Sequence, residues 1–226
     1  MPELPEVETV RSGLIPALQG RRVEQVVLNR PNLRFPFPEG MVERLAGHRV
    51  ERIDRRAKYL LLRLTSGETL LVHLGMSGRF SIEAAATRQP GDFVYAAPAN
   101  PKHDHVVFEI EGGVTIRYND PRRFGFMLMF ETGSEAGQPN LAGLGPEPNS
   151  NRFSGPALGA ALAGKRTPVK SALLDQRVVA GLGNIYVCEA LHRAGISPLR
   201  EARNIPGVRA ERLATAIRNV IEEAIA

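Results

Sequence analysis

The hydrophobic pattern of this chain changes its period near Thr132, and this change constrains the fold more than any other feature. Before it, runs of β-branched, aromatic and leucine residues lie between turn signals, which is typical of strands. These runs span residues 22–30, 58–74, 105–119 and 124–130. Two of them contain a hairpin, with turns at residues 66–68 and 112–113. After Thr132, apolar residues recur every three or four positions, which predicts helices. We therefore expect an α+β chain with a β-rich part followed by an all-helical part.

Turn-forming residues divide the chain into two predicted domains. Residues 132–152 are rich in Gly, Pro, Asn and Ser, and we interpret them as a linker between an N-terminal domain, residues 1–131, and a helical domain, residues 153–226. The predicted helices span Glu6–Leu18, Met41–Leu45, Pro156–Ala163, Pro168–Leu174, Ile185–Arg193 and Gly207–Ala226. No Gly or Pro stops the last helix, so we expect that either the protein ends there or the sequence is a fragment.

The composition excludes several classes of protein. With 43% hydrophobic and 23% charged residues, the chain can bury a core and is not disordered. Its single cysteine excludes an internal disulfide framework and a zinc site built from several thiolates. No apolar stretch approaches the roughly 18 to 20 residues that cross a bilayer, and the acidic N-terminus is not typical of a secretory signal. We therefore expect a cytoplasmic protein. The net charge of +5 and the pI of about 9.8 favour a polyanionic partner, but only weakly.

Pro2 is the first residue whose position suggests chemistry. Removal of the initiator Met makes its secondary amine the chain terminus. An α-amino group has a pKa near 8, against about 10.4 for lysine, so at pH 7.5 roughly a quarter of such amines are unprotonated. This amine is a ready nucleophile that forms an iminium directly with an aldehyde. If Met1 is retained, the Pro2 nitrogen is an amide and cannot attack.

Two carboxylates, Glu3 and Glu6, lie beside this amine in the sequence. A carboxyl group near an amine that attacks a sugar carbon can act as a general acid or base. The same residue types are also ordinary at the start of a helix, where Pro is tolerated and acidic side chains favour the helix dipole. These residues alone therefore leave capping and catalysis both open.

Several separated motifs change that balance. They are PELPEVETVRSGL, RRAKYLLL, HLGMSGRF, YNDPRRFG, LGPEP and KSALLDQRVVAGLGNIYVCEALHRAGISP. Over nearly the whole chain they resemble the formamidopyrimidine-DNA glycosylase family, bacterial base-excision enzymes for oxidised purines. The related endonuclease VIII family, whose substrates are oxidised pyrimidines, typically begins with a PEGPEI-like segment. Leu4 and Val7 therefore favour the purine-lesion branch.

The resemblance implies a fold and an activity. The fold is an N-terminal antiparallel β-sandwich with flanking helices, followed by an all-helical domain with a helix–two-turn–helix motif. The activity is that of a bifunctional enzyme, which excises 8-oxoguanine and formamidopyrimidines and then cleaves the abasic site by β,δ-elimination. The implied partner is double-stranded DNA containing an oxidised purine or an abasic site, bound by a monomer at the bacterial nucleoid and not at a membrane.

The family's catalytic residues correspond to the N-terminal motif and to one lysine. The mature N-terminal proline of the family is the nucleophile, which corresponds to Pro2. Glu3 corresponds to the acid/base that assists opening of the deoxyribose ring, and Glu6 to the second N-terminal carboxylate. Lys58 corresponds to the lysine that contacts phosphates beside the lesion and supports catalysis. Without the resemblance, Lys58 would equally suit a solvated basic edge of a sheet.

Two further motifs correspond to loops that contact DNA in the family. His73 corresponds to a phosphate-contacting histidine. Met76, Arg122 and Phe124 correspond to a triad that fills the space of the extruded base, hydrogen-bonds the orphaned cytosine and kinks the duplex. Taken alone, a Met usually fills a core, a His is usually structural, and DPRRFG is equally typical of a loop between strands.

The GLGN segment precedes a predicted helix, where backbone N–H groups can bind phosphate. A glycine-rich turn alone is more often an ordinary loop. By the resemblance, Asn184 is the phosphate-binding asparagine of the helix–two-turn–helix motif, and Lys165 extends the basic surface toward the lesion. Cys188 is expected on the buried side of the following helix as an inert core residue.

Members of the family usually continue into a lesion-capping loop and a C-terminal finger with four cysteines, one zinc ion and a phosphate-gripping arginine. Cys188 is the only cysteine here, so this chain offers no such ligand set. We therefore expect it to lack that segment, and the resemblance implies zinc only for a longer family member.

Two other functions stay open at this point. One is a non-catalytic protein that binds damaged DNA, against which the retention of Pro2, Glu3, Glu6 and Lys58 argues; activity on an abasic duplex separates the two. The other is an enzyme that uses Pro2 on a small aldehyde or sugar. The DPRRFG and GLGNIY motifs argue against it, and a salt-sensitive gel shift on duplex DNA discriminates.

Overall fold

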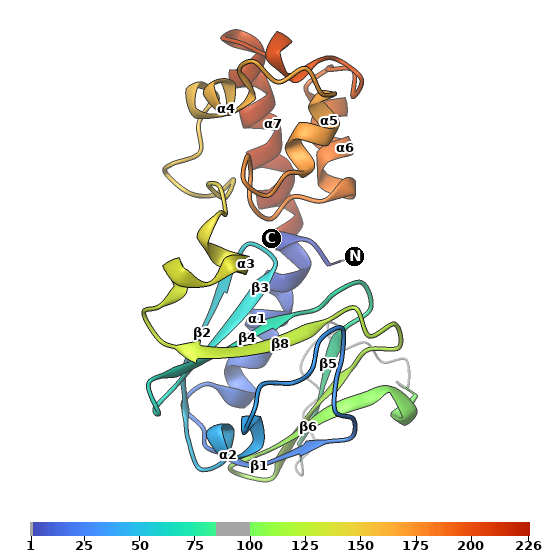
Figure 1. Ribbon diagram of the computed structural model, residues 1–226. Helices are drawn as coiled ribbons and strands as arrows, with labels where there is room; N and C mark the ends of the chain where they lie inside the picture. The colour runs from blue at the N-terminus through green and yellow to red at the C-terminus, as the bar shows by residue number, and fades with distance from the viewer. Residues whose placement is uncertain (1, 85–99) are drawn as a thin grey trace. The chain divides into compact units, whose positions relative to one another are not determined.

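The computed structural model describes residues 2–84 and 100–226, which form two compact units (Figure 1). Unit 1 contains Pro2 and residues 6–134, whereas unit 2 contains residues 3–5 and 135–226. The inclusion of residues 3–5 in the helical unit follows from Leu4, whose side chain is fully buried in the core of unit 2. The first residues of the chain are thus divided between the two units.

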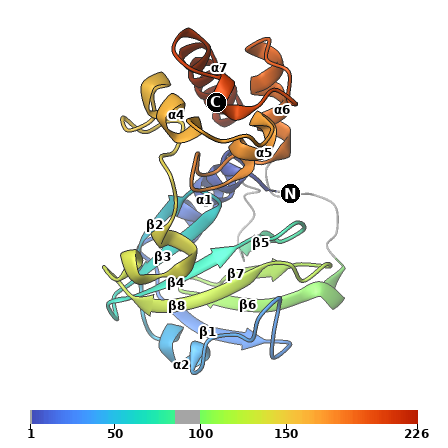
Figure 2. The ribbon, with the colours of Figure 1, turned by 45° about the horizontal axis from the view of Figure 1, so that its top comes forward.

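Unit 1 contains two four-stranded sheets (Figures 1 and 2). The first sheet has the order β2 (Val50–Arg56), β3 (Tyr59–Leu64), β4 (Glu68–His73) and β8 (Phe126–Glu131). The second has the order β1 (Val23–Leu28), β6 (Asp104–Ile110), β7 (Val114–Asn119) and β5 (Arg79–Ala84). Neighbouring strands are antiparallel in both sheets. Apolar side chains from both sheets share one core, so unit 1 is a β-sandwich and the predicted α+β class is confirmed.

Strands β2 and β5 are not predicted by the sequence pattern. Both lie at the edge of a sheet. Strand β2 has the sequence VERIDRR. Only Val50 and Ile53 are buried, and its other side chains are at least partly exposed. Edge strands often carry charged side chains, which discourage pairing with another molecule. A prediction based on hydrophobic runs therefore misses β2, because most of its residues are charged.

The helices of unit 1 are short except for the first. They are α1 (Leu4–Leu18), α2 (Met41–Leu45) and the 3-10 helix η1 (Pro101–His103). Helix α1 begins two residues before the predicted start at Glu6, because Pro5 lies in the first turn, where a missing N–H leaves no helical hydrogen bond unmade. Val7, Leu14 and Leu18 of this helix are buried in the sandwich core.

Unit 2 is helical. Its elements are η2 (Glu135–Gly137), α3 (Pro139–Ala142), α4 (Gly155–Leu162), α5 (Val169–Leu174), α6 (Asn184–Arg193), η3 (Ala202–Asn204) and α7 (Val208–Ile225). Leucine, isoleucine and valine side chains of α4 to α7 form its core. Most of the segment interpreted as a linker belongs to this unit: the N–H of Ala180 donates to Pro146, and the guanidinium of Arg218 donates to the backbone oxygen of Pro148. These hydrogen bonds give the segment an ordered course despite its loop-like composition.

Candidate nucleic-acid interface and catalytic N-terminus

Pro2 and Glu3, the candidate nucleophile and acid/base, differ in exposure. Pro2 is half-buried, and Met1 before it lies outside the described residues. Glu3 is only 2% exposed. Its carboxylate accepts hydrogen bonds from the backbone N–H groups of Gly183 (2.6 Å), Ile185 (2.9 Å) and Tyr186 (3.4 Å). Glu3 therefore caps the N-terminus of α6, where unpaired donors and the helix dipole favour a negative charge.

The glycines of the GLGN turn make room for the N-terminal residues. A Cβ atom on Gly183 would lie 2.5 Å from the carboxylate of Glu3, and one on Gly181 would lie 2.6 Å from the side chain of Leu4. Gly181 also has a φ of +95°, which side chains rarely tolerate. The sequence analysis assigned the backbone N–H groups at the start of this helix to phosphate binding. That prediction was wrong for the N–H groups of Gly183, Ile185 and Tyr186, because they donate to the Glu3 carboxylate.

The other candidates of unit 2 lie at its surface. Asn184 is the first residue of α6 and is exposed, so its side chain is accessible to a ligand. Lys165 is half-buried in the connection between α4 and α5. The pKa of Asp175 is lowered, chiefly by hydrogen bonds from Arg177, with a smaller contribution from the charge of Lys165. Lys165 is therefore within electrostatic range of the end of α5.

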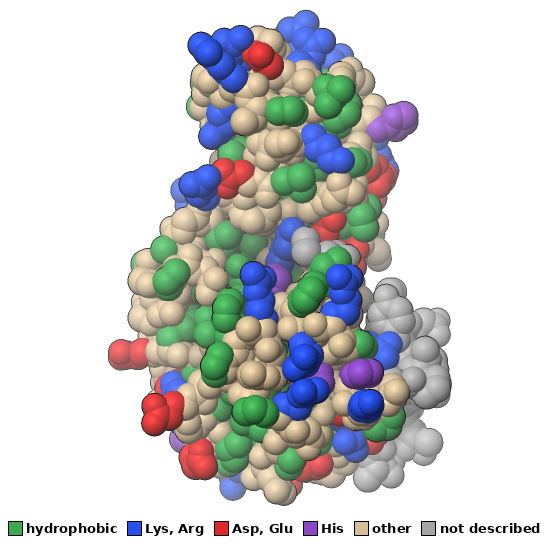
Figure 3. Space-filling model, turned by 45° about the vertical axis from the view of Figure 1, so that its right-hand side comes forward, with side chains coloured by type: hydrophobic (Ala, Val, Ile, Leu, Met, Phe, Trp, Pro, Cys, Tyr) green, Lys and Arg blue, Asp and Glu red, His purple; other side chains and the backbone are tan. Residues whose placement is uncertain are grey.

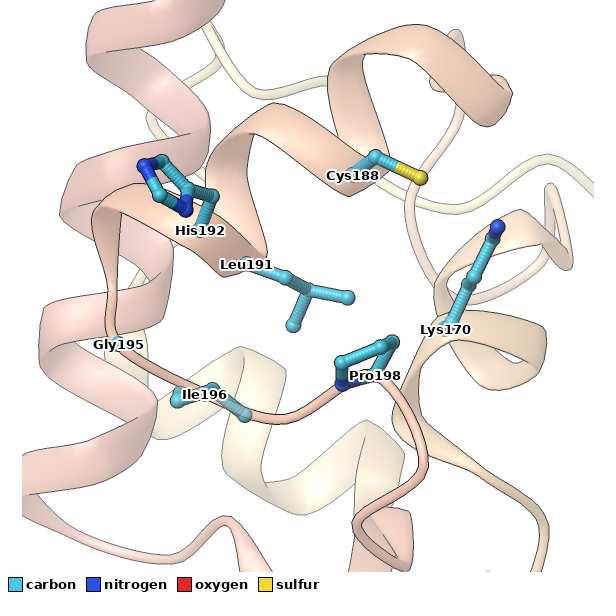
Figure 4. A pocket seen from close by; sticks show the side chains of 7 residues that line it. All are labelled: Lys170, Cys188, Leu191, His192, Gly195, Ile196 and Pro198. Carbon is cyan, nitrogen blue, oxygen red and sulfur yellow. The ribbon is translucent and has the colours of Figure 1, made fainter.

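Cys188 is exposed, so the expectation of a buried core thiol was wrong. The helical period places Val187 and Leu191 in the core and turns Cys188 outward. Its side chain lies at a pocket of about 410 Å³ between α5, α6 and the loop that follows α6 (Figure 4). Lys170, Cys188 and His192 supply the polar atoms of this pocket, and Leu191, Ile196 and Pro198 the apolar ones.

In unit 1, Lys58 is held at a tight turn. Arg56 pairs with Tyr59, so β2 and β3 are joined by a two-residue turn made of Ala57 and Lys58. Ala57 has a φ of +52°, which is uncommon for a residue other than Gly and is often found at functional positions. Lys58 is only 8% exposed, so its stem packs against protein while the turn fixes its direction.

His73, at the end of β4, is uncharged at neutral pH. Burial, the charge of Lys58 and that of Arg34 lower its pKa to about 4. Its Nδ1 accepts a hydrogen bond from the backbone N–H of Gly75 at 3.1 Å. A neutral imidazole with an accepting Nδ1 carries its proton on Nε2. His73 can therefore donate one hydrogen bond to a phosphate but brings no charge.

Arg34 is a cation that the sequence reading missed. It contributes to the low pKa of His73, its backbone N–H donates to Gly125, and its guanidinium lies 5.4 Å from the centre of the Phe35 ring. The Phe35 ring in turn contacts Phe126, which stacks on His73 with ring centres 5.0 Å apart. The available signal was an arginine followed by an aromatic residue in the proline-rich LRFPFP segment. In the part of Figure 3 that holds the sheets, Lys, Arg and His side chains gather on one face.

The triad of Met76, Arg122 and Phe124 lies on two neighbouring loops. Met76 follows β4 and is 41% exposed, while Phe124 precedes β8 and is 43% exposed. The guanidinium of Arg122 covers the Phe124 ring at 4.8 Å. Gly75 has a φ of +62°, and a Cβ atom there would collide with the backbone of Phe124. The two loops therefore touch through their backbones, and their three large side chains project from one small area.

The buried side chain of Asp120 connects these two loops. It is fully buried, and its carboxylate accepts hydrogen bonds from the Ser77 hydroxyl (2.5 Å) and the Gly125 N–H (2.9 Å). The Tyr118 hydroxyl is 3.5 Å away, and burial together with Asp120 raises the pKa of Tyr118 well above its usual value. Ser77 also accepts the N–H of Arg122 at 3.2 Å.

Glu6 and Glu8 have different surroundings. Glu6 is exposed on the first turn of α1. Glu8, which the sequence reading did not select, accepts hydrogen bonds from Arg11 (2.5 Å) and Arg55 (2.7 Å). Burial would raise the pKa of Glu8, but these two arginines outweigh it and the pKa is lowered. Glu8 thus has a structural role in fixing α1 on β2.

Two family models match this chain. The formamidopyrimidine-DNA glycosylase N-terminal domain matches residues 1–127, and the H2TH domain of the same enzymes matches residues 144–226. The chain belongs to the formamidopyrimidine-DNA glycosylase family. The assignment confirms the resemblance drawn from the motifs, and it makes this chain a DNA glycosylase of base-excision repair, an enzyme class that also has AP lyase activity.

Similar proteins agree with this assignment. The chain is 56% identical over 225 residues to formamidopyrimidine-DNA glycosylase of Cereibacter sphaeroides, and 56% identical over 232 residues to that of Azorhizobium caulinodans. It is matched over its full length and covers 78% and 79% of these relatives. Among solved structures, MutM (Fpg) of Thermus thermophilus has a TM-score of 0.83 at 39% identity, covering 99% of this chain and 76% of that one. Lactococcus lactis Fpg in complex with abasic-site DNA has a TM-score of 0.85 at 29% identity, covering 99% and 79%.

The described residues do not fit a metal site. Within residues 2–84 and 100–226, no three His, Cys, Asp or Glu side chains lie close enough together to hold a metal ion. In the same part of the chain, no helix is both long and apolar enough to cross a membrane.

Proposed function

We propose that this formamidopyrimidine-DNA glycosylase removes 8-oxoguanine and formamidopyrimidines from duplex DNA with Pro2 as its nucleophile. The observation that carries this proposal is the fixed position of Glu3 directly after Pro2. Three backbone donors hold the Glu3 carboxylate, and Glu3 directly follows Pro2 in the chain. A nucleophile next to a positioned carboxylate is an arrangement suited to covalent catalysis with acid/base assistance.

The proposed reaction has two stages. The Pro2 nitrogen attacks C1′ of the damaged nucleotide, the bond between C1′ and the base breaks with its electron pair on the base, and the base takes up a proton from solvent. The proton of the Pro2 amine passes to Glu3, which delivers it to the ring oxygen as the bond between C1′ and that oxygen breaks, and this leaves an iminium between Pro2 and C1′. The iminium accepts the electron pair of the C2′–H bond as that proton is lost to solvent and the 3′ phosphate leaves, and loss of the C4′ proton then expels the 5′ phosphate. Hydrolysis of the iminium frees the enzyme and leaves a one-nucleotide gap.

Lys58, His73 and Asn184 are proposed to bind phosphates near the lesion, and Lys165 a more distant part of the same strand. Lys58 supplies charge, whereas neutral His73 supplies a hydrogen-bond donor. Arg34 joins this group in our proposal, because it is an exposed cation on the segment that packs on Phe126 beside His73. Contacts of this kind carry affinity without sequence preference, as a repair enzyme needs.

Met76, Arg122 and Phe124 are proposed to insert into the duplex. The anomeric carbon cannot be reached inside the base stack, so the nucleotide must be turned out of the helix. Exposed apolar side chains on a rigid loop can enter the stack and replace the base, while an arginine can hydrogen-bond the partner left behind. Glu6, exposed near the N-terminus, is the second proposed carboxylate. The site of action in this proposal is chromosomal DNA in the bacterial cytoplasm.

Product analysis tests the proposal. The Met-processed protein is incubated with duplex DNA that contains 8-oxoguanine opposite cytosine, and the strand ends are examined on a denaturing gel and by mass spectrometry. The expected product carries a phosphate on both sides of a one-nucleotide gap. An intact strand with a hydrolysed abasic site would instead show a water nucleophile and would exclude the role given to Pro2.

A further inference from the structure

Two loops of unit 1 are joined by a buried acid that the catalytic proposal does not use. The first loop follows β4 and carries Met76; the second lies between β7 and β8 and carries Arg122 and Phe124. A hydrogen bond between Ser77 and Asp120, which are 43 positions apart in the sequence, connects the two loops. Contact between these loops therefore depends on side-chain chemistry and not on chain connectivity.

Asp120 makes hydrogen bonds at every polar position of the residue. Its carboxylate receives the Ser77 hydroxyl and the Gly125 N–H, its own N–H donates to the His103 oxygen, and its carbonyl oxygen lies 2.9 Å from Nε2 of His105. His105 is fully buried. Since buried hydrogen bonds are costly to leave unmade, this set fixes the start of the second loop in one conformation.

Ser77 is the link between the loops. Its hydroxyl donates to Asp120 and accepts the backbone N–H of Arg122 at 3.2 Å. Ser77 directly follows Met76 in the sequence, and Arg122 is two residues before Phe124. One hydroxyl group thus contacts both loops within two residues of each large exposed side chain.

We propose that Ser77 and Asp120 are positioning residues that hold Met76, Arg122 and Phe124 as one preformed wedge. The proposal rests on the insertion role given to these three side chains above. A flexible pair of loops would have to be ordered at the same moment as the base is unstacked, and both costs would then oppose extrusion of the nucleotide. A wedge ordered in advance leaves only the cost of unstacking.

Two substrates separate this role from a general contribution to folding. An 8-oxoguanine duplex requires extrusion of a stacked base, whereas an abasic duplex has no base to extrude. Ser77→Ala is expected to slow the reaction on 8-oxoguanine DNA about tenfold more than the reaction on abasic DNA, because only the first needs the full wedge. Equal losses on both substrates, or no loss on either, would overturn the proposal.

Two matched variants complete the test. Ser150→Ala removes a serine hydroxyl that donates to a backbone oxygen at 2.7 Å in unit 2. It is expected to leave the rate ratio, the rate on 8-oxoguanine DNA divided by the rate on abasic DNA, unchanged. Ser77→Thr keeps the hydroxyl group, so its ratio should lie closer to that of the parent protein than the ratio of Ser77→Ala. The reverse order would contradict a role for the hydroxyl.

Met76→Ala distinguishes failure of this inference from failure of the wedge itself. If Met76→Ala lowers the rate ratio and Ser77→Ala does not, Met76 acts in extrusion and the positioning role is wrong. If neither variant changes the ratio, the insertion role fails as well. A 2-aminopurine base beside the lesion gives a second readout, because its fluorescence rises when stacking is lost; Ser77→Ala should delay that rise.

Discussion

Glu3 and Asp120 are two buried carboxylates that are anchored in the same way and serve different purposes. Glu3, in unit 2, accepts three backbone N–H groups at the start of α6. Asp120, in unit 1, accepts a hydroxyl and a backbone N–H between two loops. Glu3 receives all three donors from a segment about 180 positions away, and Asp120 receives one donor from Ser77, 43 positions away, and one from nearby Gly125, so each carboxylate ties two parts of its unit together.

The difference between them lies in what stands beside the carboxylate. Glu3 follows Pro2, which we propose as the nucleophile once Met1 is removed, so in this proposal its anchoring supports the chemistry. Asp120 has no such neighbour, and in our proposal its anchoring holds the loop side chains that enter the base stack. A buried, well-bonded acid is therefore not evidence of catalysis by itself; the neighbouring functional group decides.

The largest expected effect is the loss of excision when the Glu3 carboxyl group is replaced. Glu3→Gln should lower excision of 8-oxoguanine by about 10²- to 10⁴-fold, because it removes an acid/base group. Binding of lesion DNA should change little, since no phosphate contact is lost. Single-turnover rates and a binding titration measure the two quantities separately. Excision by Glu3→Gln at the parent rate would refute the role given to Glu3.

The anchoring itself predicts a loss of stability at both sites. Glu3→Ala and Asp120→Ala should each lower the free energy of unfolding by about 1–3 kcal/mol, because each leaves buried donors without an acceptor. Glu6→Ala is the matched control: its carboxylate is exposed, and a change within about 0.5 kcal/mol is expected. Urea unfolding measures all three variants. A loss at only one of the two buried acids would show that they are not anchored alike.

The phosphate contacts should give a smaller effect on binding. Lys58→Gln should reduce the slope of log affinity against log salt concentration by about one, as the loss of one phosphate contact predicts. Arg52→Gln removes the same charge from an exposed residue of β2 that pairs with Asp54 at 2.9 Å. That control should leave the slope close to its original value. Equal slopes for Lys58→Gln and the parent protein would remove Lys58 from the interface.

The last prediction concerns the charge of His73. Its folded pKa of about 4 lies below the usual 6.5, so the unfolded chain binds more protons between these values. The stability contributed by neutral His73 is therefore complete above pH 6.5 and is lost as the pH falls toward 4. Histidine resonances followed by NMR give the midpoint directly. A midpoint for His73 near 6.5 would mean that its surroundings do not hold the imidazole in the neutral form.

The sequence selected candidate residues for this site but not their contacts. Local pattern alone left Pro2, Lys58 and the DPRRFG loop open between structural and functional roles, and the resemblance to a family made them candidates. Gly183 could not be interpreted correctly in the same way, because its partner Glu3 is 180 positions away. Such long-range approaches depend on tertiary packing, which leaves no periodic trace in the sequence.

Surface elements were harder to predict for a related reason. Strand β2 carries charges because it lies at a sheet edge, and Cys188 points outward although its neighbour Val187 is fully buried. Residue type indicates burial only on average. Helical phase decides the individual case, and an error of one position in that phase turns a core residue into a surface one.

Borohydride trapping tests the central claim most directly. The Met-processed protein is mixed with an 8-oxoguanine duplex in the presence of borohydride, and the cross-linked peptide is identified by mass spectrometry. The account predicts a stable adduct on the Pro2 nitrogen, greatly reduced in Pro2→Gly and absent from protein that retains Met1. An adduct on a lysine side chain, or undiminished trapping by protein that retains Met1, would contradict it.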